Sequence, residues 1–98
     1  MSDIQPYKID FDLDQAIKSM EKWGVSVPFL RKIKLYVDAG HISISFDEVD
    51  FEANTWDGTL NVHIIKPLST KQVVNLVGNA YADEVTAMCD TMISFWWD

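Results

Sequence analysis

The dipeptide Asp57-Gly58 constrains the fold of this 98-residue chain most strongly, because it separates two runs in which apolar and polar residues alternate. Such alternation is typical of β-strands that bury one face. Asp-Gly favours a type I′ turn, which requires positive φ at both central positions and matches the twist of paired strands. The turn would pair side chains on one face of the sheet: Thr55 with Leu60, Ala53 with Val62, and Phe51 with Ile64. We therefore expect a β-hairpin with strands at 49–56 and 59–65.

The segment 25–38 fits two different structures. A helix beginning near Pro28 would place five apolar residues on one face: Phe29, Leu30, Ile33, Tyr36 and Val37. A strand would instead alternate Ile33, Leu35 and Val37 towards one face. A two-residue turn at Ala39-Gly40 would pair such a strand with the run at 41–47, which a helix would leave without a neighbour. We therefore expect strands at 32–38 and 41–47.

Helical spacing predicts two helices, one on each side of these strands. The first spans 12–23, with an acidic first turn and Gly24 placed to end it. Ser69 and Gln72 have the spacing of a capping box, and apolar residues at three- and four-residue steps follow as far as Trp96. This pattern predicts a long C-terminal helix, in which Gly78-Asn79 introduces a kink or a break.

These elements together predict a two-layer α+β domain with the order α-β-β-β-β-α. A four-stranded antiparallel meander would bury its apolar face under the two helices and leave a polar face on the other side. The chain is long enough for one domain and too short for two, so we expect a single domain spanning 1–98. Residues 1–6 are expected to form a flexible tail, and residues 7–11 fit a short strand.

Cysteine content and hydropathy bear on where the protein acts. Its single cysteine, Cys89, has no partner for an intramolecular disulfide and lies among apolar residues, which predicts a small buried side chain. The chain begins without the charged-then-apolar pattern of a secretory leader. Its apolar runs are shorter than the roughly 20 residues that cross a membrane. We therefore expect a soluble cytoplasmic protein that does not bind membranes.

The charge of −7 is distributed unevenly along the chain. Residues 35–98 carry ten acidic residues and only two basic ones, Lys66 and Lys71, for a net charge of −8. Direct binding to nucleic acid is disfavoured, because that affinity comes from lysine and arginine displacing counterions from phosphates. A basic protein surface would instead be attracted.

The predicted polar face offers two weak chemical hypotheses. Glu52 across from His63 would make an acid/base pair, although opposite charges often pair across exposed strands and an open sheet face does not exclude water. His41 and His63 with Asp38 or Glu52 have suitable atoms for zinc, but their spacing matches no compact metal motif. There is no other catalytic signature and no phosphate-binding loop. We therefore expect a non-enzymatic protein without a metal or cofactor.

The sequence favours a small acidic protein-binding module as the function. An example is an inhibitor of the immunity or phage anti-defence type that acts on a basic, nucleic-acid-handling protein. The expected contact residues are Asp47, Glu48, Asp50, Glu52, Asp57, Trp56, Tyr36, His63 and Trp97. The alternative is a homo-oligomeric structural protein, for example a homodimer, joined through the C-terminal helix or an edge strand. Base stacking of single-stranded nucleic acid on Tyr36 and Trp56 is a third hypothesis, which the charge disfavours.

Overall fold

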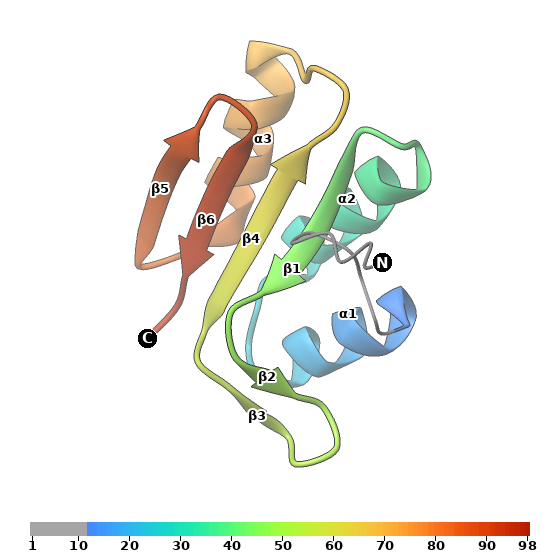
Figure 1. The fold of residues 1–98 in the computed structure, drawn as a ribbon, viewed down its shortest axis with the longest axis vertical. Coiled ribbons are helices and arrows are strands. Elements are labelled where there is room, and N and C mark those ends of the chain that lie inside the picture. Colours follow the sequence, from blue (N-terminus) through green and yellow to red (C-terminus); the bar gives the residue numbers. More distant parts are fainter. Residues whose placement is uncertain (1–11) are drawn as a thin grey trace, which may run out of the picture.

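The computed structural model describes residues 12–98, which form three α-helices, a four-stranded antiparallel sheet and a separate two-stranded sheet (Figure 1). The helices are α1 (Leu13–Lys22), α2 (Val27–Asp38) and α3 (Thr70–Ala80). The larger sheet has the order β1-β4-β6-β5 and contains β1 (Ile42–Phe46), β4 (Thr59–Ile64), β5 (Glu84–Cys89) and β6 (Met92–Trp96). The smaller sheet pairs β2 (Val49–Asp50) with β3 (Thr55–Trp56). The tail expected at 1–6 and the strand expected at 7–11 lie outside the described residues.

The first helix is confirmed nearly as predicted. Asp12 is the N-cap of α1, and its side chain accepts a hydrogen bond from the backbone N–H of Asp14 at 3.0 Å. Ala16 and Met20 are fully buried, as the apolar stripe requires. Gly24 follows the helix with φ +97°, a conformation that glycine adopts without a Cβ penalty.

The strand expected at 32–38 is wrong, because this segment is part of helix α2. Pro28 lies in its first turn, where the missing N–H costs no hydrogen bond. The helix buries its apolar stripe of Phe29, Leu30, Ile33 and Tyr36, whereas Leu35 is 61% exposed. The run at 41–47 does not need a strand at 32–38 as its neighbour, because it pairs with β4.

The apolar faces of the strands predicted at 41–47 and 59–65 are confirmed, but their partners differ from those expected. β1 pairs directly with β4, with Ile44 opposite Val62 and Ser43 opposite His63. Ile42, Ile44, Leu60 and Val62 are buried, as the alternation predicts. The pairings expected for Phe51, Ala53 and Thr55 with β4 do not form.

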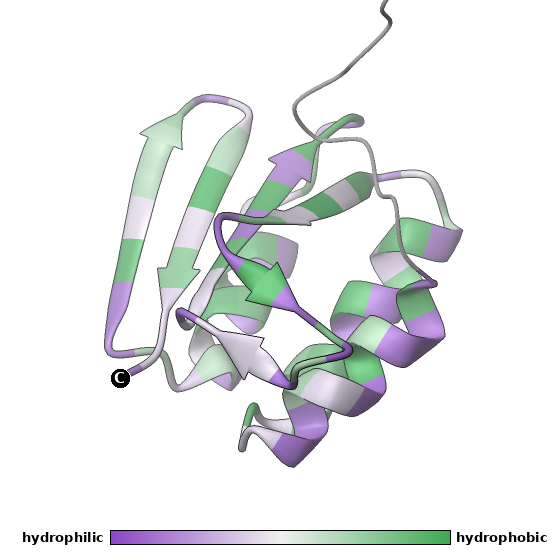
Figure 2. Ribbon diagram, turned by 60° about the horizontal axis from the view of Figure 1, so that its bottom comes forward, coloured by the Kyte–Doolittle hydropathy of each residue, from purple (hydrophilic) through white to green (hydrophobic). Residues whose placement is uncertain are grey.

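The strand expected at 49–56 is interrupted, which explains the changed pairing. Residues 51–54 form a turn between β2 and β3. The Asp50 carboxylate accepts a hydrogen bond from the Ala53 N–H at 3.0 Å, and Asn54 has φ +60°. Asparagine tolerates this left-handed conformation better than most residues do. The segment therefore folds back on itself as a short hairpin, which lies beyond the lower end of the four-stranded sheet in Figure 1 and comes forward in Figure 2.

Asp57-Gly58 makes a bend and not the expected type I′ hairpin turn. Only Gly58 has positive φ, at +87°, and the Asp57 carboxylate accepts a hydrogen bond from the Thr59 N–H at 3.0 Å. The Gly58 carbonyl accepts a hydrogen bond from the Trp97 N–H at 3.0 Å. The dipeptide therefore passes the chain from β3 to β4 and brings the C-terminal segment against it.

The long C-terminal helix is the other wrong expectation. Its capping box is confirmed, with Ser69 and Gln72 bonded to each other's backbone N–H at 3.1 and 2.8 Å. However, α3 ends at Ala80, two residues after Gly78, and Tyr81 takes φ +50°. The rest of the chain forms the β5–β6 hairpin, because Ile93 and Phe95 alternate into the core as strand residues do.

The layers follow from this order of elements. α2 and α3 lie behind the four-stranded sheet, and α1 lies beside β2 and β3 (Figure 1). α3 connects β4 to β5, so a helix interrupts the expected run of strands. The fold is thus α+β with a four-stranded antiparallel sheet, and its core is a single cluster to which all three helices contribute. No helix within residues 12–98 has the length and apolar character needed to cross a membrane.

Candidate functional site

Four acidic residues predicted to contact a partner gather around the β2–β3 hairpin. They line a hollow of about 530 Å³ together with Trp56. We call it the acidic hollow; its lining residues are Asp47, Glu48, Val49, Asp50, Thr55, Trp56 and Asp57. No lysine, arginine or histidine is among these residues, so the surface has one sign of charge.

Hydrogen bonds hold three of these carboxylates in place. Asp47 Oδ1 accepts from the Asn61 side-chain amide at 2.7 Å, and Asn61 is buried in β4. The Oδ1 atoms of Asp50 and Asp57 accept from backbone N–H groups of Ala53 and Thr59. None of these three bonds involves Oδ2. The acidic side chains are therefore oriented before any partner binds, which lowers the entropic cost of binding.

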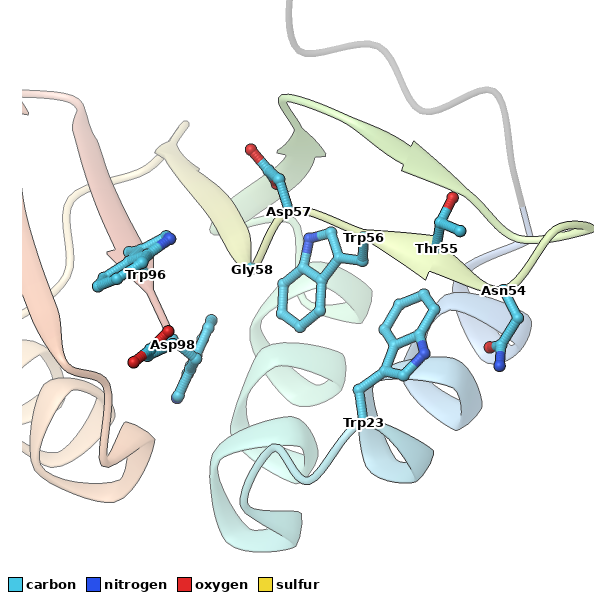
Figure 3. A pocket seen from close by; sticks show the side chains of 9 residues that line it. Trp23, Asn54, Thr55, Trp56, Asp57, Gly58, Trp96 and Asp98 are labelled. Atoms are coloured by element: carbon cyan, nitrogen blue, oxygen red, sulfur yellow. The ribbon is translucent and has the colours of Figure 1, made fainter.

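A second hollow, which is also lined by β3, is aromatic. All four tryptophans of the chain line it, although they come from the end of α1, from β3 and from the segment that ends the chain. We call it the tryptophan hollow, with a volume of about 450 Å³; its lining residues are Trp23, Asn54, Thr55, Trp56, Asp57, Gly58, Trp96, Trp97 and Asp98 (Figure 3). The two hollows share Thr55, Trp56 and Asp57, so they are adjacent parts of one surface.

Ring contacts and hydrogen bonds fix three of the four tryptophans. The Trp23 and Trp56 rings stack with centroids 5.2 Å apart, and the Trp97 ring lies 5.7 Å from Trp56. The indole N–H of Trp56 donates to the Thr59 carbonyl at 3.0 Å, and that of Trp97 donates to the Ala80 carbonyl at 2.9 Å. Trp96 is 36% exposed and lies across the hollow from Trp56 (Figure 3). The ring planes of Trp23, Trp56 and Trp97 are thus set by the fold.

The other predicted contact residues are placed differently. Glu52 lies in the exposed turn of the β2–β3 hairpin, next to the acidic hollow. Trp97 is partly buried against Phe29, with ring centroids 5.7 Å apart. The outward position predicted for Tyr36 is wrong, because α2 turns this residue into the core, where it is 7% exposed.

His63 lies on the polar face of β4, and the expected pairing with Glu52 does not form. Its strand neighbours are Ser43 and Met92, and its Nε2 atom is 2.8 Å from Ser45 Oγ. This distance is within reach of a serine–histidine proton transfer, and it is equally that of a cross-strand hydrogen bond. Burial lowers the pKa of His63 below its usual 6.5.

The lowered pKa of His63 makes stability depend on pH in a stated direction. The unfolded chain takes up a proton at about 6.5, before the folded protein does. The free energy of unfolding should therefore be unaffected by the titration of His63 above this pH, and it should fall as the pH drops below it. Denaturant unfolding between pH 7.5 and 5 measures this effect, and His63→Gln should remove this component of the slope. An NMR titration that gave His63 a pKa above 6.5 would contradict the prediction.

Metal-binding side chains do not cluster within residues 12–98, because no group of three histidine, cysteine, aspartate or glutamate side chains there could hold a metal ion. The expectation that Cys89 is buried is wrong, since it is exposed at the end of the edge strand β5. A hydrogen bond from Thr91 lowers the pKa of its thiol.

Sequence reasoning missed Trp23 and Trp96 as members of the surface. Trp23 belongs to the apolar stripe of α1, and Trp96 to the spacing that suggested a helix. The count of four tryptophans in a short chain is the one available signal, but only the tertiary fold brings their rings together. Comparisons with protein-family models, with curated proteins and with solved structures found no match.

Proposed function

We propose that the protein is a small non-enzymatic binding module that docks a basic surface of another protein against the β2–β3 hairpin. The supporting observation is the acidic hollow, in which four carboxylates surround Trp56 without a basic residue among the lining. Complementary charge speeds association and orients the partner, while a central aromatic residue supplies apolar contact area.

The acidic composition of residues 35–98 fits this function better than nucleic-acid binding. Contact with phosphates would need a cluster of lysine and arginine, whereas the hairpin surface repels phosphate. The proposed partner is a protein that itself handles nucleic acid, because such proteins carry extended basic surfaces. An inhibitor that covers this basic surface would block access of the nucleic acid, which is how an immunity or anti-defence protein would use the hollow.

A charge reversal within the acidic hollow tests the proposal. Glu48 lines the hollow, so Glu48→Lys should weaken binding of a hexa-lysine peptide at low salt by about threefold or more. Asp90→Lys is the matched control, because it makes the same change of net charge at the β5–β6 turn. Isothermal titration calorimetry measures both. Equal weakening by the two variants would show that only net charge matters and would refute docking at the hollow.

Self-association through an edge strand is the second candidate function. All six residues of β5 are exposed, and β5 forms one edge of the four-stranded sheet with Val85 40% and Met88 57% exposed. An edge strand presents unpaired backbone groups to which a second copy can add a strand. The other proposed route, a long C-terminal helix, is lost because that segment is a hairpin. Light scattering over a dilution series tests this candidate, and a monomer at every concentration excludes it.

A further inference from the structure

We infer that the tryptophan hollow holds the guanidinium group of an arginine side chain from the basic partner. This inference rests on the proposed function, because it assigns the arginine to the same partner that docks on the acidic hollow. The two hollows meet at Thr55, Trp56 and Asp57, so neighbouring side chains of one basic segment reach both.

The chemistry of the walls selects a cation. The faces of aromatic rings carry negative potential and attract cations, and tryptophan does so more strongly than phenylalanine or tyrosine. Two carboxylate residues, Asp57 and Asp98, also line the hollow, and no basic side chain is among the lining residues. An apolar ligand would satisfy the rings and leave the carboxylates without a counter-charge.

The chemistry of arginine favours a guanidinium over an ammonium group as the bound cation. The indole N–H groups of Trp56 and Trp97 are already bonded to backbone carbonyls. Trp56 also stacks on Trp23 and Trp97 on Phe95, so each of these two rings has one face covered. Trp96, on the opposite side of the hollow, is 36% exposed (Figure 3). Arginine is planar, stacks on aromatic faces and is less strongly hydrated than lysine, and its fork of donors suits a carboxylate at the rim.

A pair of peptides of equal charge tests the inference without knowledge of the natural partner. Hexa-arginine should bind the wild-type protein about two- to fivefold more tightly than hexa-lysine at low salt, the range expected for an exposed cation–π contact. Trp96→Ala should abolish this preference and leave hexa-lysine binding unchanged. Trp96→Phe should restore part of the preference, because its ring still presents a face.

The two proposals can fail separately. Equal affinities of the wild-type protein for the two peptides would overturn the arginine assignment, while the weakening of hexa-lysine binding by Glu48→Lys would still support the acidic hollow. Conversely, an arginine preference that depends on Trp96, together with equal effects of Glu48→Lys and Asp90→Lys, would support a guanidinium site at Trp96 and overturn docking of the same partner at the acidic hollow. Failure of both peptides to bind at low salt would overturn both proposals.

Indole N–H resonances of the wild-type protein give a readout that does not depend on a variant folding. Hexa-arginine should shift the indole signal of Trp96 more than hexa-lysine does, and no difference would overturn the inference. Two other occupants have their own signatures. A trimethyl-lysine peptide that binds as tightly as hexa-arginine would indicate a quaternary ammonium group as the occupant. Indole shifts that depend on protein concentration alone would indicate that a second copy of the chain occupies the hollow. Either result overturns the arginine assignment.

Discussion

Replacement of Gly58 by alanine should be among the most destabilising single changes in this protein, lowering the free energy of unfolding by about 2–5 kcal/mol. Two costs add. The residue has φ +87°, where an L side chain is strained by about 1–2 kcal/mol. Its new Cβ would also lie 2.2 Å from the Trp97 carbonyl oxygen, so the backbone must move, at a cost of about 1–3 kcal/mol for overpacking.

Two other glycines separate these costs. Gly24 has φ +97° but no atom near its missing Cβ, so Gly24→Ala should cost only the strain of about 1–2 kcal/mol. Gly78 is inside α3 without either problem, and Gly78→Ala should stabilise the protein by about 0.5–1 kcal/mol. Urea unfolding followed by tryptophan fluorescence ranks the three variants. An equal cost at Gly58 and Gly24 would contradict the close approach of the C-terminal segment to Gly58.

The close contact at Gly58 links the fold to the proposed site. Gly58 and Trp97 are joined by the hydrogen bond from the Trp97 N–H, and both line the tryptophan hollow. This contact holds the end of β6 beside β3, so it sets the distance between Trp96 and Trp56. Residues at the site are therefore positioned by a backbone contact that no local sequence pattern reveals.

Local signals predicted the parts of the fold that depend on near neighbours along the chain. The acidic first turn of the helix expected at 12–23, the box formed by Ser69 and Gln72, and the alternation in 41–47 and 59–65 each specify structure within a few residues. Strand pairing depends on distant segments, and here the Asp57-Gly58 signal was misleading. Asp50 and Asn54 carry a competing turn signal that explains the short β2–β3 hairpin.

The C-terminal error has a different cause. Val85, Met88, Met92 and Trp96 have helical spacing, but Ile93 and Phe95 also alternate with Ser94 as in a strand. Periodicity alone does not separate the two patterns in a short apolar segment. Burial decides the matter, because β6 fills the space between β4 and β5 and Phe95 is fully buried.

The candidate site was predicted only in part, because local sequence reveals only features that depend on near neighbours along the chain. The acidic residues at 47–57 are close in sequence, so any compact structure there concentrates their charge. The tryptophan hollow combines three separated segments and depends on the β5–β6 hairpin that the sequence pattern did not indicate. Local sequence thus predicts the charge of the surface, while its aromatic part follows from the tertiary fold.

Substitutions of Leu35 and Tyr36 give the sharpest test of helix α2. One of them, Tyr36→Ala, should also have a large effect on the free energy of unfolding. Tyr36→Ala should lower the free energy of unfolding by about 3 kcal/mol, because it removes a core aromatic ring that is 7% exposed. Leu35→Ala should change it by no more than about 0.5 kcal/mol, since Leu35 is 61% exposed. The alternating strand would give the opposite ranking, with Leu35 buried and Tyr36 outward. Denaturant unfolding of these adjacent variants therefore distinguishes the two structures, and a larger cost at Leu35 would restore the strand and remove α2 from the core.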